Sequence, residues 1–108
     1  MMDIELTMRL QHVVEPFGDY LDGIFERAVT AAATAVLRHP QPNYVLTKIA
    51  EEAGEVVKAG VHYAEGRDFT WDDIEAECVQ TIAMCLRLLI EGDQVHGVLP
   101  PHATETKQ

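Results

Sequence analysis

The chain has 108 residues, of which 47% are hydrophobic but only 6% aromatic, and this composition indicates a single all-α domain over residues 1–108. A formal net charge of -10 argues against binding of a nucleic-acid polymer, because that needs clustered Lys and Arg. No segment predicts a signal peptide or a membrane span, so we expect a soluble, cytoplasmic protein without membrane contacts.

Hydrophobic spacing predicts a short helix followed by three long ones. The short amphipathic helix covers about residues 4–14, where Pro16 and Gly18 interrupt it. We expect this helix to pack on the core or to exchange onto a partner. The first long helix covers about residues 19–38 and ends before Pro40, because proline disfavours helix at the residue that precedes it.

Two further long helices complete the predicted core, which extends over about residues 17–93. Asn43 is the expected N-cap of the second long helix, which runs to about residue 64. Thr70 is the expected N-cap of the third, which continues to about residue 91 and is apolar over most of its circumference. Such a helix lies at the centre of a bundle or at an oligomer interface. Residues 94–108 are expected to form an extended tail.

Two acidic pairs on successive helices carry the strongest functional signal. Glu52 and Glu55 lie three residues apart on the second long helix, and Glu77 and Gln80 lie three residues apart on the third. Side chains at i and i+3 share a helix face, so antiparallel packing would turn the two pairs toward each other. Three carboxylates and one amide oxygen are suitable ligands for Mg²⁺, or for Mn²⁺ in its place, and leave positions for water and substrate phosphates.

The acidic residues also have a simpler interpretation. Glutamates are common on solvated helix faces, where pairs such as Lys48 with Glu52 contribute only a few tenths of a kcal/mol. Glu77 and Gln80 favour a site, because they interrupt an apolar helix and buried polar groups must be paired or bound to a ligand. A structural hydrogen-bonded pair inside the bundle would meet the same requirement.

Two runs of sequence resemble the MazG-type all-α nucleoside triphosphate pyrophosphohydrolases: KIAEEAGEVVKA at 48–59 and ECVQTIAMCLRL at 77–88. That family is marked by Glu-x-x-Glu, a spacer of about this length, and Glu-x-x-Asp. Gln80 departs from the pattern, because it stands where the family has its last aspartate. An amide oxygen also binds Mg²⁺, and Asp73, one turn before Glu77, is an alternative source of the missing carboxylate.

The resemblance implies a MazG-like helical bundle with three long core helices and a short N-terminal helix, assembled as a homodimer or homotetramer. It implies a Mg²⁺ site formed by Glu52, Glu55, Glu77 and Gln80. It also implies cleavage of a nucleoside triphosphate to the monophosphate and pyrophosphate. Glu51 and Glu52 are the expected catalytic residues, and we take Glu51 as the base that orients the attacking water.

Three basic residues near the acidic faces are candidates to bind the triphosphate: Lys48, Lys58 and Arg87. The alternative is that each extends its stem along its helix and keeps its charge in water. Arg87 is the strongest candidate, because it interrupts an apolar run. Trp71 and Tyr63 either stack on a base or pack at the core boundary.

Two other functions are alternatives to this one. A non-catalytic helical interaction protein would use the apolar third helix as a dimer contact, and Gln80 favours it because a carboxylate is missing. A phosphoribosyl-nucleotide pyrophosphohydrolase would share the helical metal site. Only the substrate separates this second alternative from a nucleoside triphosphate enzyme.

Overall fold

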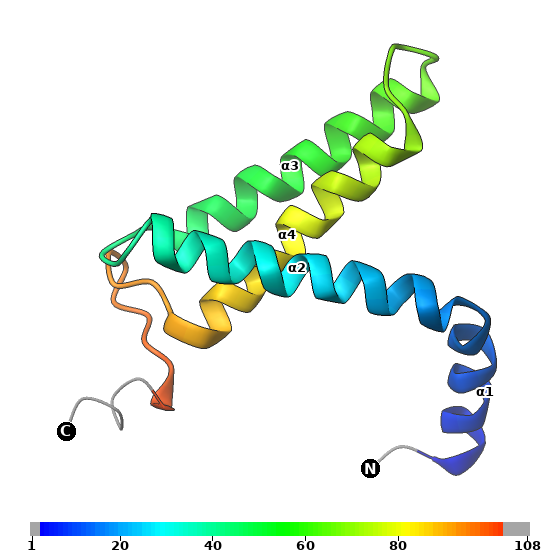
Figure 1. Ribbon diagram of the computed structural model, residues 1–108, viewed down its shortest axis with the longest axis horizontal. Coiled ribbons are helices and arrows are strands. Elements are labelled where there is room, and N and C mark those ends of the chain that lie inside the picture. The colour runs from blue at the N-terminus through cyan, green and yellow to red at the C-terminus, as the bar shows by residue number, and fades with distance from the viewer. Residues whose placement is uncertain (1–2, 103–108) are drawn as a thin grey trace.

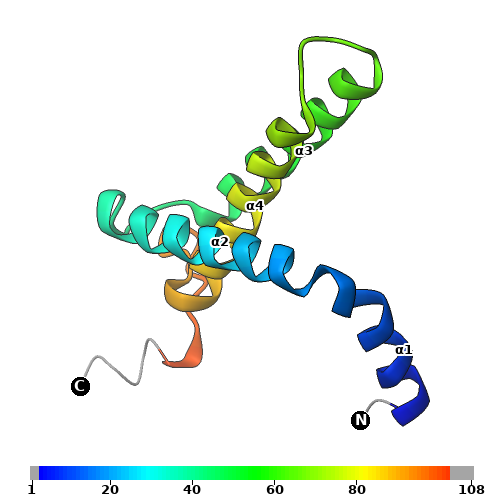
Figure 2. The same ribbon diagram turned by 45° about the vertical axis from the view of Figure 1, so that its right-hand side comes forward.

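The computed structural model describes residues 3–102, which form four α-helices joined by short connections (Figure 1). The elements in chain order are α1 (Ile4–Val14), the 3₁₀ turn η1 (Glu15–Phe17), α2 (Gly18–Arg38), α3 (Val45–Ala64) and α4 (Trp71–Glu91). α3 and α4 run antiparallel side by side, and α2 crosses α4 (Figures 1 and 2). The predicted all-α architecture with three packed long helices is confirmed over these residues. None of the described helices is long and apolar enough to cross a membrane.

α1 and α2 form one helical run that changes direction at η1 (Figure 1). Pro16 lies at the start of η1, and its missing N–H breaks the ladder of α-helical hydrogen bonds there. Gly18, which we expected to interrupt the helix, instead begins α2. α1 contains no buried residue and extends away from the α3–α4 pair (Figures 1 and 2). Its apolar side chains therefore stay largely uncovered by the rest of residues 3–102.

α3 begins differently from the sequence prediction. Its N-cap is Tyr44, so the assignment of Asn43 was wrong. Tyr44 provides no side-chain cap, and the Leu46 N–H instead donates to the carboxylate of Asp93 at 2.8 Å. Asn43 turns back, and its side-chain amide donates to the carbonyl of His39 at 3.4 Å. A carboxylate far away in the sequence has therefore replaced the expected local cap.

α4 begins as predicted, with Thr70 as its N-cap. The Thr70 hydroxyl accepts from the Asp73 N–H at 3.3 Å, and the Asp73 carboxylate accepts from the Thr70 N–H at 2.7 Å. This reciprocal pair is a capping box, which satisfies two backbone donors at the helix start. The Asp73 carboxylate is thus already bonded at the start of α4, which argues against it as a replacement for the missing carboxylate.

A buried cluster lies where α2 crosses α4, and two of its three residues are alanines. Ala32, Ala83 and Met84 are its buried residues, and alanines at a crossing let two helix backbones approach closely. Nearby, the hydroxyl of Tyr20 and the guanidinium of Arg27 both donate to Glu75 at 2.6 Å. These two contacts attach the first half of α2 to the first half of α4.

Much of the apolar surface stays open. The radius of gyration is 16.9 Å, whereas a compact domain of this length has about 13 Å. Leu89 and Ile90 of α4 are 67% and 55% exposed, so the apolar circumference of α4 is only partly covered. Exposed large side chains also follow α1, η1 and α2, among them Ile4, Met8, Val13, Phe17 and Phe25.

The chain folds back after α4. Gly92 ends the helix with φ 77°, and Asp93 and Val98 then pair through two backbone hydrogen bonds of 2.7 and 2.9 Å. The tail predicted from residue 94 is therefore not extended over residues 94–98. The final part of that predicted tail, residues 103–108, lies outside the described residues.

Replacing Gly92 with alanine should destabilise the fold by at least about 1 kcal/mol. A Cβ there would lie 2.2 Å from the Val98 carbonyl oxygen and 2.8 Å from Pro100 Cδ, and φ is positive. Gly66→Ala is the matched control, because Gly66 also has a positive φ of 74° but no atom within 4 Å of the place that a Cβ would take. Urea unfolding should show a clearly larger loss for Gly92→Ala, and equal losses would contradict the steric argument.

Candidate functional site

A cavity of about 670 Å³ opens where α2, the α2–α3 connection, α3 and α4 meet. Its charged and amide side chains are Arg38, Asn43, Lys48, Glu52, Gln80 and Arg87. Ala31 and Ala35 of α2 form part of the same wall, and their small side chains leave room beside the helix. Several of the residues singled out in the sequence therefore line one common space.

Glu52 is the acidic residue in the wall of this cavity, and it is partly buried. Burial raises the pKa of its carboxyl group, and the negative charge of Glu77 on α4 raises it further. Lys48 lowers the pKa of Glu52, while Glu51 and Glu55 raise it. The antiparallel packing of α3 and α4 thus brings Glu52 and Glu77 close enough to repel each other.

The remaining members of the two acidic pairs are more open. Glu55 is exposed on α3, and Glu77 is partly buried on α4. Gln80 is exposed and lines the cavity, so the expectation that it is buried inside an apolar helix was wrong. Its amide faces an open space. Of the two residues, the argument that a buried polar group needs a partner therefore applies only to Glu77.

Glu51 and Lys48 lie at the edge of the site. Their closest charged atoms, Lys48 Nζ and Glu51 Oε2, are 3.8 Å apart; Lys48 is partly buried and Glu51 is exposed. Lys58 is exposed as well and does not line the cavity. The geometry therefore favours Lys48 over Lys58 as a contact for a ligand in this space.

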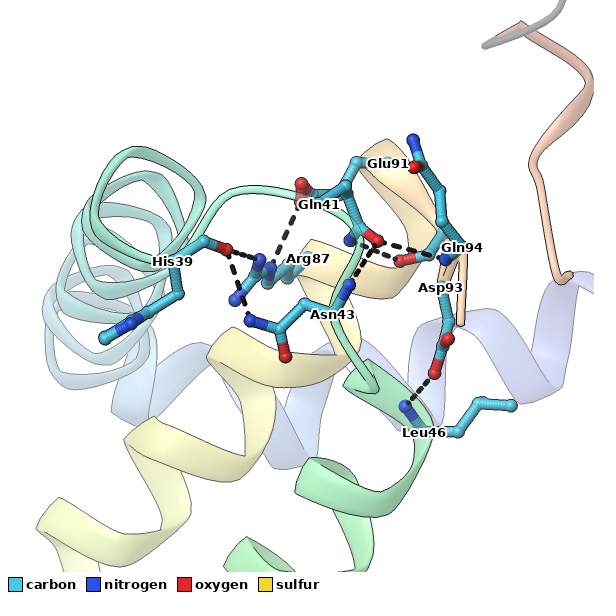
Figure 3. A network of polar contacts seen from close by, with 9 residues as sticks. His39, Gln41, Asn43, Leu46, Arg87, Glu91, Asp93 and Gln94 are labelled. Atoms are coloured by element: carbon cyan, nitrogen blue, oxygen red, sulfur yellow. Dashed lines mark hydrogen bonds and ion pairs between the residues drawn. The ribbon is translucent and has the colours of Figure 1, made fainter. Parts of the chain in front are cut away.

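Arg87 is buried, with 2% of its surface exposed, and it reaches the cavity wall from α4. Its Nε donates to Glu91 at 3.1 Å, and its Nη2 donates to the carbonyl of His39 (Figure 3). The alternative that Arg87 extends along its helix and keeps its charge in water therefore does not apply. These bonds fix the guanidinium and tie α4 to the α2–α3 connection.

The α2–α3 connection is held by a second set of contacts around Gln41 (Figure 3). The side-chain oxygen of Gln41 accepts from the backbone N–H groups of Asn43 and Gln94, both at 3.0 Å. Its side-chain nitrogen donates to the carbonyl of Gly92 at 3.2 Å. One amide side chain thus joins the wall of the cavity to the segment that follows α4.

Trp71 and Tyr63 do not line the cavity. Their ring centroids are 6.2 Å apart in an edge-to-face arrangement at the turn between α3 and α4. This agrees with the packing interpretation of both residues. The aromatic side chain in the cavity wall is Tyr44, which is 53% exposed.

The acidic residues have the right donor atoms for a divalent cation, but they are not arranged around one point. Glu52, Glu55 and Glu77 supply hard carboxylate oxygens from two facing helices, and a cation would relieve the charge crowding at Glu52. Among residues 3–102, however, no three His, Cys, Asp or Glu side chains are gathered closely enough to hold a metal ion. The donors suit Mg²⁺, but as placed they do not form a coordination shell.

Sequence reasoning missed the contribution of α2 and the α2–α3 connection. Arg38, His39, Asn43 and Tyr44 all line the cavity. Arg38 was detectable as a basic residue at the very end of a predicted helix. Its approach to Lys48 and Arg87 depends on the tertiary bonds of the connection, which leave no periodic pattern in the sequence.

Comparisons with known proteins do not identify a family for this chain. No protein-family model matches the sequence, no curated protein matches it, and no solved structure matches it. The resemblance to the MazG-type enzymes therefore rests on the two acidic runs.

Proposed function

We propose that the chain is a Mg²⁺-dependent nucleotide pyrophosphohydrolase that cleaves a nucleoside triphosphate to the monophosphate and pyrophosphate. One observation carries the proposal: Glu52, whose pKa is raised by burial and by Glu77, shares a cavity with Lys48 and Arg87. Repelling carboxylates beside cationic side chains suit a ligand that combines a metal ion with phosphates. The resemblance of both acidic runs to MazG-type enzymes supports the same reaction.

Glu52, Glu55 and Glu77 would hold the metal, with Gln80 as an amide ligand; of these four, Glu52 and Gln80 line the cavity. A bound Mg²⁺ would neutralise charge on the phosphoryl oxygens, and Mn²⁺ would serve in its place. Side-chain rearrangement is needed to bring these oxygens together. Glu55 and Gln80 are free to rearrange because both are exposed.

The chain's own residues would position the reactants. Lys48 and Arg87 would bind phosphate oxygens, and the bonds of Arg87 to Glu91 and His39 keep its guanidinium in place. Glu51 would accept a proton from water as the water oxygen bonds to the α-phosphorus. The bond from that phosphorus to the bridging oxygen breaks, and pyrophosphate leaves with the electron pair.

We further propose that the chain assembles as a homodimer or homotetramer. The exposed apolar side chains of α1 and α2 and the large radius of gyration support this, because a monomer rarely leaves so much apolar surface in water. The same exposed surface supports the alternative function, a non-catalytic helical interaction protein. That alternative predicts assembly without any turnover.

The test is pyrophosphate release from a panel of ribo-, deoxyribo- and damaged nucleoside triphosphates with Mg²⁺ or Mn²⁺. We expect release from at least one triphosphate and none when EDTA replaces the metal. A phosphoribosyl-nucleotide in the same panel separates the related pyrophosphohydrolase. Absence of release from every compound would contradict the proposed function and leave the interaction protein as the better account.

A further inference from the structure

The cavity contains more basic than acidic side chains, although acidic residues outnumber basic ones in the chain. The chain has 8 Lys and Arg residues against 18 Asp and Glu. Three of the basic residues, Arg38, Lys48 and Arg87, line the cavity, and Glu52 is the single acidic residue among its lining side chains within residues 3–102. An acidic protein thus places three of its few basic side chains around one cavity.

The three cations come from three different helices: Arg38 ends α2, Lys48 belongs to the first turn of α3 and Arg87 to the last turns of α4. Arg87 is paired with Glu91 and Lys48 lies 3.8 Å from Glu51, so their charges are partly balanced, whereas Arg38 has no such partner within residues 3–102. Only the tertiary fold brings these side chains together. A chance cluster along one helix does not account for the arrangement.

The three side chains differ in how far they are already engaged. Arg87 is buried and bonded to Glu91 and the His39 carbonyl, whereas Lys48 makes only a 3.8 Å ion pair with Glu51. The exposed guanidinium of Arg38 has no hydrogen bond or ion pair within residues 3–102. Arg38 therefore retains all its donors for a ligand, and a guanidinium binds phosphate oxygens in pairs.

We propose that Arg38 is a substrate-binding residue and that, with Lys48 and Arg87, it forms a polyphosphate site that binds without a metal ion. This deepens the proposed function, on which it rests for the identity of the substrate. Glu52 opposes such binding by its negative charge. A metal at the acidic residues would strengthen the site, but the three cations do not depend on it.

The test is isothermal titration of wild-type protein with inorganic tripolyphosphate in EDTA, with pyrophosphate and the intact nucleotide as separate titrants. Arg38→Gln should weaken tripolyphosphate binding about tenfold, as expected for the loss of one charge-assisted contact. Arg67→Gln is the matched control, since Arg67 pairs with Glu65 in the turn after α3, outside the cavity lining. Glu52→Gln should strengthen binding in EDTA, because it removes the opposing charge.

Arg38 also lies in the last turn of α2, where a cation favours the helix dipole. If that is its whole role, Arg38→Gln will lower the melting temperature and leave the tripolyphosphate affinity unchanged, which overturns the proposal. Equal loss in Arg67→Gln, or no binding to wild type, overturns it too. Tripolyphosphate binding that needs Arg38, without hydrolysis of any triphosphate, would support this site and contradict the proposed reaction alone.

Discussion

Glu52→Gln is expected to lower pyrophosphate release at least about 100-fold, because loss of a metal ligand should exceed the roughly 10–100-fold effect typical of residues that only orient a ligand. Glu52 faces Glu77 across the α3–α4 pair and lines the cavity. The amide keeps the shape of the side chain but removes the charge that the metal needs. Steady-state assays at saturating Mg²⁺ measure the effect.

Glu26→Gln is the control for this change, because Glu26 is an exposed residue of α2 that does not line the cavity. It should retain wild-type turnover. If Glu52→Gln also turns over at the wild-type rate while both variants remain folded, Glu52 is neither a catalytic residue nor a metal ligand.

The same substitution should have the opposite effect on stability when no metal is present. The pKa of Glu52 is raised above its ordinary value of 4.5, so the folded state holds the proton more tightly than the unfolded state. Wild-type stability should therefore fall as pH rises from about 4.5 through the folded pKa. Glu52→Gln should lack this decrease and melt at a higher temperature than wild type at pH 7 in EDTA.

Asp93→Asn is expected to lower the melting temperature by roughly 10 °C. Asp93 is fully buried, and its carboxylate accepts from the Leu46 N–H at 2.8 Å. It also contacts the N–H of His96 at 2.8 Å and the Nδ1 of its ring at 2.9 Å. Asparagine has one acceptor oxygen in place of two, and its NH₂ group would face donors, so α3 would lose part of its cap.

The pH dependence of this effect has a definite sign. Burial by itself would raise the pKa of Asp93, but donation from Leu46 and His96 outweighs it and lowers the pKa from 3.8 to about 2. A lowered pKa contributes stability above pH 3.8 that is lost as pH falls toward about 2. Thermal melting from pH 2 to pH 7 should show this loss in wild type and a smaller one in Asp93→Asn.

Asp68→Asn provides the matched control, because Asp68 lies exposed in the turn between α3 and α4. It should melt within about 2 °C of wild type, as is usual for a surface substitution. An Asp93→Asn variant that melts like Asp68→Asn would show that the buried carboxylate is not needed to hold α3 against the segment after α4.

Local chemistry made most of the helix boundaries predictable. The first predicted helix, 4–14, and the start and end of α4 agree with the structure, because Pro16, Thr70 and Gly92 act on their immediate neighbours. The prediction of the start of α3 was wrong because the contact that fixes it comes from a residue far away in the sequence. Its N-cap residue, Tyr44, provides no side-chain bond, and the Leu46 N–H is instead bonded by Asp93, which no rule based on nearby residues connects to Leu46.

Part of the candidate site was also predictable from local pattern, and part was not. Helical periodicity predicted that the pair Glu52 and Glu55 would face the pair Glu77 and Gln80. In the structure the charge of Glu77 raises the pKa of Glu52, but within residues 3–102 the three carboxylates are not gathered closely enough to hold a metal ion. Periodicity did not predict that Gln80 would be exposed or that Arg38 would approach the site from α2. Both depend on how α2 crosses α4, which is set by small side chains such as Ala32 and Ala83.

Mg²⁺ titration followed by thermal melting tests the central claim most directly, since a ligand that binds the native state raises its melting temperature. We expect millimolar Mg²⁺ to raise the midpoint of wild type and to have no effect on a variant that combines Glu52→Gln with Glu77→Gln. An unchanged midpoint in wild type, or an equal rise in the double variant, would contradict a metal site between α3 and α4.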